Sequence, residues 1–404
     1  MRRLALMLVL GACGARAPRG EPVARRALGM NDVSILLPLP TAMGAPVVAT
    51  IEGERGVALV GRGAYERLVT ATGDLGPKQG ELAAYRDVHL VAVRFDLCDR
   101  QALGPCPAGA PGRLRLVLQP CEVVAGELRT QDVAIHAFYP IAAAELPGVI
   151  DELRAMAAIA PVAGDAPLQV SPAARSPAYV ARLKALVLRY ARADRLARAT
   201  VIGQLAGSAA FAWAFRGVDR VADARGERFV AMAIPGLAQD DRGMFEDEER
   251  GTAASEPGHA GATQQRALLA GGDTVFDARP VADAPAGFAI AINGAKFAAA
   301  GDGERRAALG ALVEIQDPTR HDTNDTQCLA CHVATYLTLR RAAALHVEPG
   351  RFASRYDTRV ASVADRDARV MRAFGWAGSA PAISQRVANE TAQVLAEVEA
   401  RYPR

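Results

Sequence analysis

Alternation of apolar and polar residues is the strongest pattern along the chain. Several short runs place an apolar residue at every second position, which predicts strands with one buried face. Because half-buried strands of this period are typical of antiparallel pairing, we expect a sheet of that kind. The strand-like runs lie at Val88–Asp96, Leu114–Leu118, Val133–Ile141, Phe211–Phe215, Arg228–Ile234, Gly287–Ile292 and Ala311–Ile315, and a short apolar strand is expected in Met30–Pro40.

A helical period appears in other parts of the chain. Pro147–Ile159 carries apolar residues at helical spacing, and Arg305–Leu312 is a shorter candidate. Ser176 followed by Pro177 is a favourable N-cap and N1 pair before an apolar stripe. Strands and helices do not alternate in a βαβ order, so the pattern predicts the α+β class. We expect a mainly antiparallel, β-rich N-terminal region with packed helices, followed by a helical C-terminal segment.

The composition is that of a globular protein and gives no sign of a polyanionic partner. The 404 residues are 50% apolar and 23% charged, and the formal net charge is +3. Nearly all positive charge is arginine, because only Lys78, Lys184 and Lys296 are lysines. We interpret this as codon bias in a GC-rich genome. No domain-wide basic excess occurs, so we expect no nucleic-acid partner.

The N-terminus has the pattern of an export signal. Arg2 and Arg3 precede a short apolar core at Leu4–Leu10, and small residues follow it. The core is too short to cross a bilayer as a permanent helix. No later segment has a long enough uninterrupted apolar run either, so we predict no transmembrane helix.

The residues Leu10-Gly11-Ala12-Cys13 resemble a bacterial lipobox. The resemblance implies cleavage before Cys13 and acylation of that residue, which would anchor the protein stably to a membrane. Gly14 does not resemble the Asp-type signal for inner-membrane retention. We therefore expect an exported lipoprotein of the cell envelope, at the outer membrane and facing the periplasm or the surface. The alternative is an ordinary signal peptide in which Cys13 is incidental.

Four segments are expected along the chain. Residues 1–12 form the signal peptide, and residues 13–29, with Pro, Gly and Arg but no apolar period, form a lipidated flexible tether. Residues 30–310 form an α+β domain without a Walker A loop, a G-x-S-x-G elbow or an H-E-x-x-H motif, so its role is unassigned. Residues 311–404 form the helical segment.

Cys98 and Cys106 are the expected disulfide. The sequence around them predicts a strand that ends near Cys98, a Gly/Pro-rich loop that holds Cys106, and a second strand from Arg113. Cys121 would lie far along that second strand, so we expect it to be an unpaired buried thiol. An exported compartment permits disulfides. Three buried thiols without any bridge are the alternative.

The most specific motif is Cys328-Leu329-Ala330-Cys331-His332, which matches the attachment motif of c-type haem. On a helix, Cys328, Cys331 and His332 share one face. Two thiols can then bond to the two vinyl groups of one haem, and the imidazole can reach its iron. Asn324 with Gln327 can cap such a helix, and good helix formers continue through Leu345. We expect one covalent haem c per chain in the helical segment.

Two other interpretations of this motif remain open. Cys328 and Cys331 could hold a metal such as zinc together with His332 and either His321 or His346. Alternatively, the two cysteines could form a redox dithiol or an incidental disulfide. Export favours haem, because c-type haem is attached outside the cytoplasm.

Met371 is the expected sixth ligand of the iron. It follows the motif at a distance that resembles the arrangement in small c-type cytochromes, and His/Met ligation suits electron transfer. A methionine on a helix can equally be core filling. An open sixth position would allow ligand binding or peroxide chemistry. Weaker candidates for the sixth ligand are His346, His321, His136 and Met244, while Trp376, Phe374 and the arginines after the motif could contact the haem.

These expectations combine into three functional hypotheses. The favoured one is an envelope-anchored, monohaem c-type cytochrome-like lipoprotein that transfers single electrons to an unidentified redox partner protein. The second is a haem peroxidase or related oxidoreductase, and the third is a non-redox binding or structural lipoprotein with a Cys/His metal site. The wider chain is similar to uncharacterised, lipobox-bearing proteins of GC-rich bacteria that carry one late haem motif, and that resemblance implies no activity.

Overall fold

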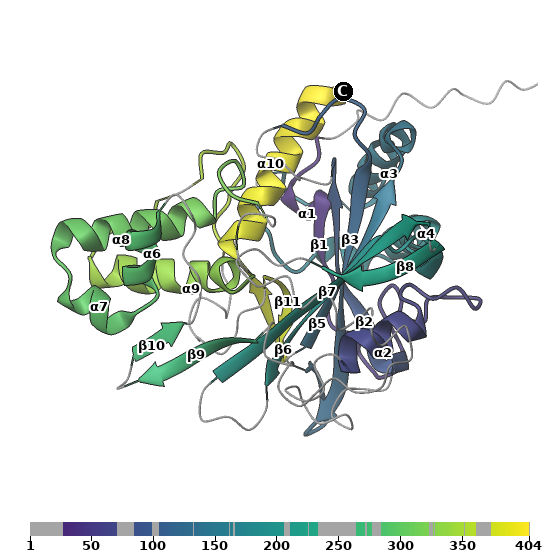
Figure 1. Cartoon of the computed structure of the whole chain (residues 1–404). Helices are drawn as coiled ribbons and strands as arrows, with labels where there is room; N and C mark the ends of the chain where they lie inside the picture. Colours follow the sequence, from purple (N-terminus) through teal and green to yellow (C-terminus); the bar gives the residue numbers. More distant parts are fainter. Residues whose placement is uncertain are drawn as a thin grey trace, which may run out of the picture.

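The computed structural model describes most of the chain after the N-terminal segment. The described residues are 27–70, 85–98, 105–131, 133–160, 162–164, 166–205, 211–224, 226–232, 264–270, 273–276, 284–322, 326, 328–350, 352–360 and 373–403. Within them, one large sheet and a group of helices form an α+β fold, as predicted (Figure 1).

Ten strands of the described residues form one sheet in which every strand pair is antiparallel. The order along it is β1-β2-β3-β5-β6-β7-β9-β10, while β4 pairs with β3 and β8 pairs with β7. The strands are β1 (Ser34–Leu36), β2 (Val88–Asp96), β3 (Gly112–Val124), β4 (Glu127–Thr130), β5 (Val133–Ile141), β6 (Arg198–Leu205), β7 (Phe211–Asp223), β8 (Gly226–Ala231), β9 (Gln264–Ala270) and β10 (Asp273–Phe276).

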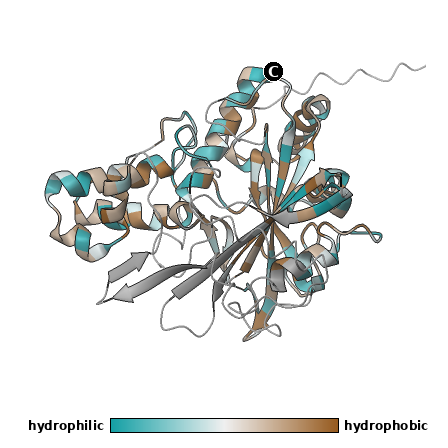
Figure 2. Ribbon diagram, in the orientation of Figure 1, coloured by the Kyte–Doolittle hydropathy of each residue, from teal (hydrophilic) through white to brown (hydrophobic). Residues whose placement is uncertain are grey.

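The two faces of the sheet differ in chemistry, as period-two alternation requires. Leu114, Leu116 and Leu118 of β3 are fully buried on the same face as Ala137 and Tyr139 of β5. Burial of such apolar side chains contributes about 1.5–3 kcal/mol each, so this face is the main core. Figure 2 shows apolar residues gathered along the central strands.

The opposite face, called the polar face below, carries charged and polar side chains. The strand register places Arg94 beside Arg115, Arg115 beside Phe138, and Phe138 beside Arg198. His136 and Thr200 face each other one pair further along β5 and β6. The polar face is covered by protein in this region, because Arg94 is only 4% exposed.

The helices lie around the sheet in separate groups (Figure 1). Helices α3 and α4 pack together, and α4 contacts β5. Helices α6 to α9 form a group beside the strands, and α10 runs between that group and the sheet. The helices are α1 (Met30–Val33), α2 (Arg62–Thr70), α3 (Leu146–Ile159), α4 (Pro177–Tyr190), α6 (Pro285–Ala291), α7 (Gly294–Ala299), α8 (Asp302–Ile315), α9 (Cys328–Ala344) and α10 (Gln385–Arg401).

The predicted disulfide joins Cys98 and Cys106, whose Cα atoms are 5.7 Å apart. Cys98 follows the end of β2, and Cys106 lies in the connection to β3. Cys121 is buried within β3 and takes part in no disulfide. Both predictions from the cysteine spacing are therefore confirmed.

Two short apolar runs predicted as strands are helical instead. Gly287–Ile292 lies mostly in α6, and Ala311–Ile315 forms the end of α8. Met30–Pro40 begins with one helical turn before β1. Short apolar runs cannot distinguish a buried strand from a buried helix by their period alone, which explains these errors.

The region after residue 310 was expected to be helical, but it also contains strands. It contains α9 and α10, but also a hairpin of β11 (Phe374–Ala377) and β12 (Ala380–Ile383). Trp376 in this hairpin is a core residue, since its indole Nε1 donates to the main-chain oxygen of Leu37 (3.0 Å) and the residue is buried.

None of the described residues forms a helix with the length and apolar composition needed to span a bilayer.

Gln119 of β3 attaches this hairpin to the large sheet. Its side-chain oxygen accepts the main-chain N–H of Trp376 (2.7 Å), and its amide donates to the oxygen of Trp376 (2.9 Å). The contact needs glycine at position 375, where φ is +155° and a Cβ atom would lie 2.5 Å from the oxygen of Gln119. The Gln119 side chain thus bonds with the main chain of β11 on both the N–H and the oxygen of Trp376, as a neighbouring strand would.

Replacing Gln119 by leucine is expected to lower the free energy of unfolding by about 1–3 kcal/mol. The substitution leaves the N–H of Trp376 buried without an acceptor, because Gln119 is fully buried. Urea denaturation followed by tryptophan fluorescence measures the change. Gln131→Leu is the matched control, since its amide contacts Glu122 at an exposed position and its loss should cost less than about 0.5 kcal/mol. Equal stability of the two variants would contradict this account.

Candidate functional site

The predicted helix at the Cys-x-x-Cys-His motif is present, and it begins at the motif. Helix α9 starts at Cys328 and ends at Ala344, while the predicted capping residues Asn324 and Gln327 lie outside the described residues. Cys328, Cys331 and His332 line one pocket together. The helical spacing therefore brings two thiols and an imidazole to the same cavity, as expected from positions i, i+3 and i+4.

A polar network fixes α9 against its neighbours. Thr335 of α9 donates to the side-chain oxygen of Gln316 (3.0 Å), and the amide of Gln316 donates to Thr338 (2.8 Å). Asn389 of α10 donates to the main-chain oxygen of Gln316 (2.8 Å). These bonds are buried, so each satisfies groups that would otherwise destabilise the fold. They hold the motif helix to α8 and α10.

Arg386 of α10 organises the chain just before the motif. Its guanidinium donates to the main-chain oxygens of Ile315 (3.0 Å), Asp317 (3.2 Å) and His321 (2.6 Å). Its Nε also donates to Glu390 (2.6 Å). One buried side chain thus closes the connection between α8 and α9, which sets where the motif begins relative to the sheet.

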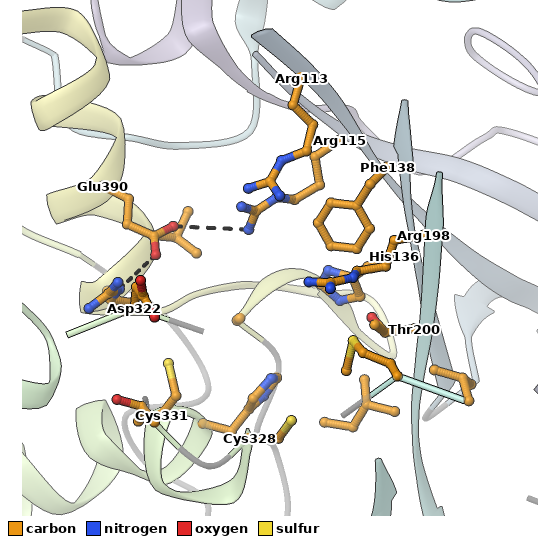
Figure 3. Close-up of a pocket in the computed structure, with 18 of the residues that line it drawn as sticks. Arg113, Arg115, His136, Phe138, Arg198, Thr200, Asp322, Cys328, Cys331 and Glu390 are labelled. Carbon is orange, nitrogen blue, oxygen red and sulfur yellow. Dashed lines mark hydrogen bonds and ion pairs between the residues drawn. The ribbon is translucent and has the colours of Figure 1, made fainter. Parts of the chain in front are cut away.

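The pocket lies between the first turns of α9 and the polar face of the sheet (Figure 3). It contains about 1130 Å³ of space, which includes open solvent at its mouth. Its walls are Arg113, Arg115, His136, Phe138, Arg198, Thr200, Val201, Ile202, Met232, Ile315, Asp322, Thr326, Cys328, Cys331, His332, Ala373, Arg386, Val387 and Glu390.

A buried group of charges, here called the arginine cluster, forms the end of the pocket near α10. It consists of Arg94, Arg113, Arg115, Arg386, Asp96 and Glu390. Asp96 contacts Arg94 (2.7 Å), Arg115 (3.3 Å) and Arg113 (3.5 Å). Glu390 bonds with Arg94 and Arg386, and it lies 4.0 Å from Arg115.

The arginine cluster has an excess of positive charge, because four guanidinium groups face two carboxylates. Burial alone would raise the pKa of Glu390, but Arg94, Arg386 and Arg115 hold it well below its usual range. Burial lowers the pKa of Arg115 to about 10, and repulsion by Arg94 and Arg113 adds to the fall. Asp322 adds one more buried carboxyl group to the pocket. The cluster remains suited to a further anionic group.

Arg113 and Arg115 are held in place by an aromatic ring. Their guanidinium carbons lie 5.0 and 5.2 Å from the ring centroid of Phe138, within the range of cation–π attraction. Both arginines line the pocket, and a planar guanidinium matches the geometry of a carboxylate.

The side chains fit the haem predicted from the motif. The two thiols and the imidazole of the motif lie on one wall of the pocket. The cationic end of the same pocket matches the two carboxylates that a haem carries. Phe138, Val201, Ile202 and Val387 supply apolar surface for the ring. The fit rests on the combination of thiols, imidazole and cationic end in one pocket, since each of these groups alone also occurs in proteins that bind no haem.

The redox-dithiol interpretation is not favoured. Burial raises the pKa of the Cys328 thiol to about 12, and Cys331 adds to the rise. An attacking cysteine of a dithiol catalyst instead has a lowered pKa, since the thiolate is its reactive form. Neither sulfur of the motif takes part in a disulfide.

Neither of the two histidines expected as an additional zinc ligand lines the pocket. His346 follows the far end of α9, so a 17-residue helix, about 25 Å long, separates it from Cys328. His321 is buried next to Arg386, but its side chain is not part of the pocket wall. Across the described ranges, no group of three or more His, Cys, Asp or Glu side chains is arranged to hold a metal ion.

Other predicted site residues lie outside the pocket or outside the described residues. Cys13, Met244 and Met371 lie outside the described residues, so their roles stay predictions. Among the described arginines after the motif, Arg341 donates to the main-chain oxygen of Ala291 (3.0 Å), and Arg355 pairs with Glu399. These arginines do not line the pocket.

The residues that sequence reasoning missed come from the sheet and from α10. The arginines that line the pocket are Arg113, Arg115, Arg198 and Arg386, whereas Arg340, Arg341, Arg355 and Arg359, which lie closer to the motif in the sequence, do not line it. The available signal was the run Arg113-Leu114-Arg115-Leu116, whose alternation places both arginines on one face. His136 is two residues before Phe138 on the neighbouring strand and so shares that face.

Comparison of the chain with protein-family models, with curated proteins and with solved structures finds no match.

Proposed function

We propose that this protein is an exported, lipid-anchored, monohaem c-type cytochrome-like protein that transfers single electrons at the cell envelope. The observation that carries the proposal is the position of Cys328, Cys331 and His332 on one wall of a pocket whose end is an arginine cluster. The disulfide between Cys98 and Cys106 supports export, because such bonds persist in oxidising compartments. Anchoring through Cys13 rests on the lipobox resemblance.

Each part of the pocket has a distinct role in this proposal. Cys328 and Cys331 would hold the haem through two thioether bonds, and His332 would ligate its iron. Arg113 and Arg115 would bind its carboxylates, while Phe138 would limit access of water to the ring. Once bound, haem supplies an iron that cycles between the ferric and ferrous states and carries one electron from a donor to an acceptor. The redox partner would be another protein of the envelope.

The protein produced with a haem-c maturation system is expected to contain one covalent haem per chain. Pyridine haemochrome spectroscopy and intact mass measure the attachment and its stoichiometry. Cys13→Ala keeps the motif unchanged and provides a form without the lipid anchor for the mass measurement. A colourless protein whose mass shows no porphyrin would remove the proposal, and stoichiometric zinc in that protein would support the metal-site alternative.

A further inference from the structure

The wall across the pocket from the motif helix offers a second imidazole. His136 of β5 lines the same pocket as His332. Figure 3 shows His136 on the strand side, with Cys328 and Cys331 on the helix side and the pocket between them. The position of His136 suggests a role that the motif alone does not indicate.

The backbone of His136 is held on both sides. It pairs with Val117 of β3 and with Thr200 of β6 in the middle of the large sheet. Residues on central strands have little backbone freedom, so the side chain projects from a rigid support. A side chain on such a support loses less conformational entropy on binding a metal than a side chain on a loop does.

Met232 is the other described side chain of the sheet wall with an atom that iron can bind. A Cβ atom at Gly217 would lie 3.0 Å from both Sδ and Cε of Met232. The end of the Met232 side chain therefore packs over Gly217, in space that the glycine leaves. This contact gives Met232 a structural role in the wall.

We infer that His136 would hold the haem iron together with His332, one imidazole from each wall of the pocket. The inference rests on the proposed function, because it requires the haem. The ligand pair would then be His332 and His136, in place of the pair of His332 and Met371 expected from the sequence. It also brings the large sheet into the redox site, since one ligand comes from α9 and the other from β5.

Two imidazole ligands have measurable consequences. With a histidine from each wall on the iron, the haem would be low-spin and would bind carbon monoxide only after losing one of them. A methionine ligand raises the reduction potential of haem, so a pair of histidines gives a lower potential than a His/Met pair. Such a site suits electron transfer, whereas a peroxidase requires an open or displaceable position.

The test compares the haem-loaded wild type with His136→Ala and His136→Met. We expect the wild type to be low-spin in its optical and electron paramagnetic resonance spectra. His136→Ala should become high-spin, should bind carbon monoxide when reduced, and should return to low spin when imidazole is added. His136→Met should have a higher reduction potential than the wild type. Met232→Leu is the control and should keep the wild-type spectrum.

The outcomes separate this inference from the proposed function. Pyridine haemochrome of every variant reports whether haem is attached, independently of the sixth ligand. A His136→Ala protein that contains covalent haem, stays low-spin and does not bind carbon monoxide would overturn the role of His136. The proposed function would be unaffected by that result. A high-spin wild type would also overturn it. Recovery of the low-spin state by imidazole supports the inference, because the added imidazole then refills the position on the iron that the side chain of His136 left open.

Discussion

Replacing Cys328 and Cys331 together by serine is expected to leave the protein without covalently bound haem. Serine preserves the size of each side chain but does not form a thioether with a vinyl group. His332 would remain and could hold haem only by a dissociable bond. Intact mass under denaturing conditions and haem staining of a denaturing gel measure the loss, which should be complete.

Cys121→Ser is the matched control for this prediction. Cys121 is the remaining described cysteine outside a disulfide and outside the motif, and it is buried in β3 away from the pocket. Its replacement should leave covalent haem unchanged. Each single variant of the motif should keep one thioether bond, which shifts the pyridine haemochrome band without removing it. Covalent haem in the double variant would show that attachment does not use this motif.

Local features of the fold could be predicted from the sequence. The bounds of β2 and β5 agree with the alternating runs, and α4 begins at Pro177 with Ser176 as its N-cap. The bond between Ser176 and the N–H of Tyr179 (3.4 Å) is a contact within one turn, so the capping rule suffices to predict it. The disulfide bridges a short loop, and its pairing followed from the strands on either side.

The pocket could not be predicted because its walls come from distant parts of the sequence. A strand register fixes which residues are neighbours across the sheet, and periodicity alone gives no register. The polar face of an antiparallel sheet usually contacts water, so the alternation of Arg113 and Arg115 gave no reason to expect a pocket. Helix α10, which supplies Arg386 and Glu390, lies within the segment expected to be helical, but neither its bounds nor its position beside the sheet was predicted.

The candidate site thus has two parts with different origins. The motif wall follows from five consecutive residues on one helix, and the sequence predicts it directly. The sheet wall depends on the antiparallel order β2-β3-β5-β6, which brings Arg94, Arg115, Phe138 and Arg198 into one row. The first part predicts what is bound, while the second gives a reason for the large domain that precedes the motif.

Replacing Glu390 by glutamine is expected to lower the free energy of unfolding by about 3–5 kcal/mol at neutral pH. The carboxylate bonds with Arg94 and Arg386 and lies 4.0 Å from Arg115. The substitution leaves four buried guanidinium groups with Asp96 as the remaining carboxylate of the cluster. Denaturant unfolding of the purified protein measures the change. Glu399→Gln on the same helix is the control, because its pair with Arg355 is partly exposed (33% and 62%) and is worth less than about 1 kcal/mol.

The same substitution is expected to flatten the dependence of stability on pH in acid. The pKa of Glu390 is lower in the folded protein than in the unfolded chain, so the unfolded chain binds more protons as the pH falls. Its contribution is complete above the ordinary carboxyl pKa of about 4.3 and is lost as the pH falls toward the depressed pKa. Glu390→Gln removes that contribution, so its free energy of unfolding should fall less steeply below pH 5 than that of the wild type, and Asp96 accounts for part of the remaining slope. Parallel pH profiles for the wild type and the variant would show that the Glu390 carboxylate does not stabilise the arginine cluster.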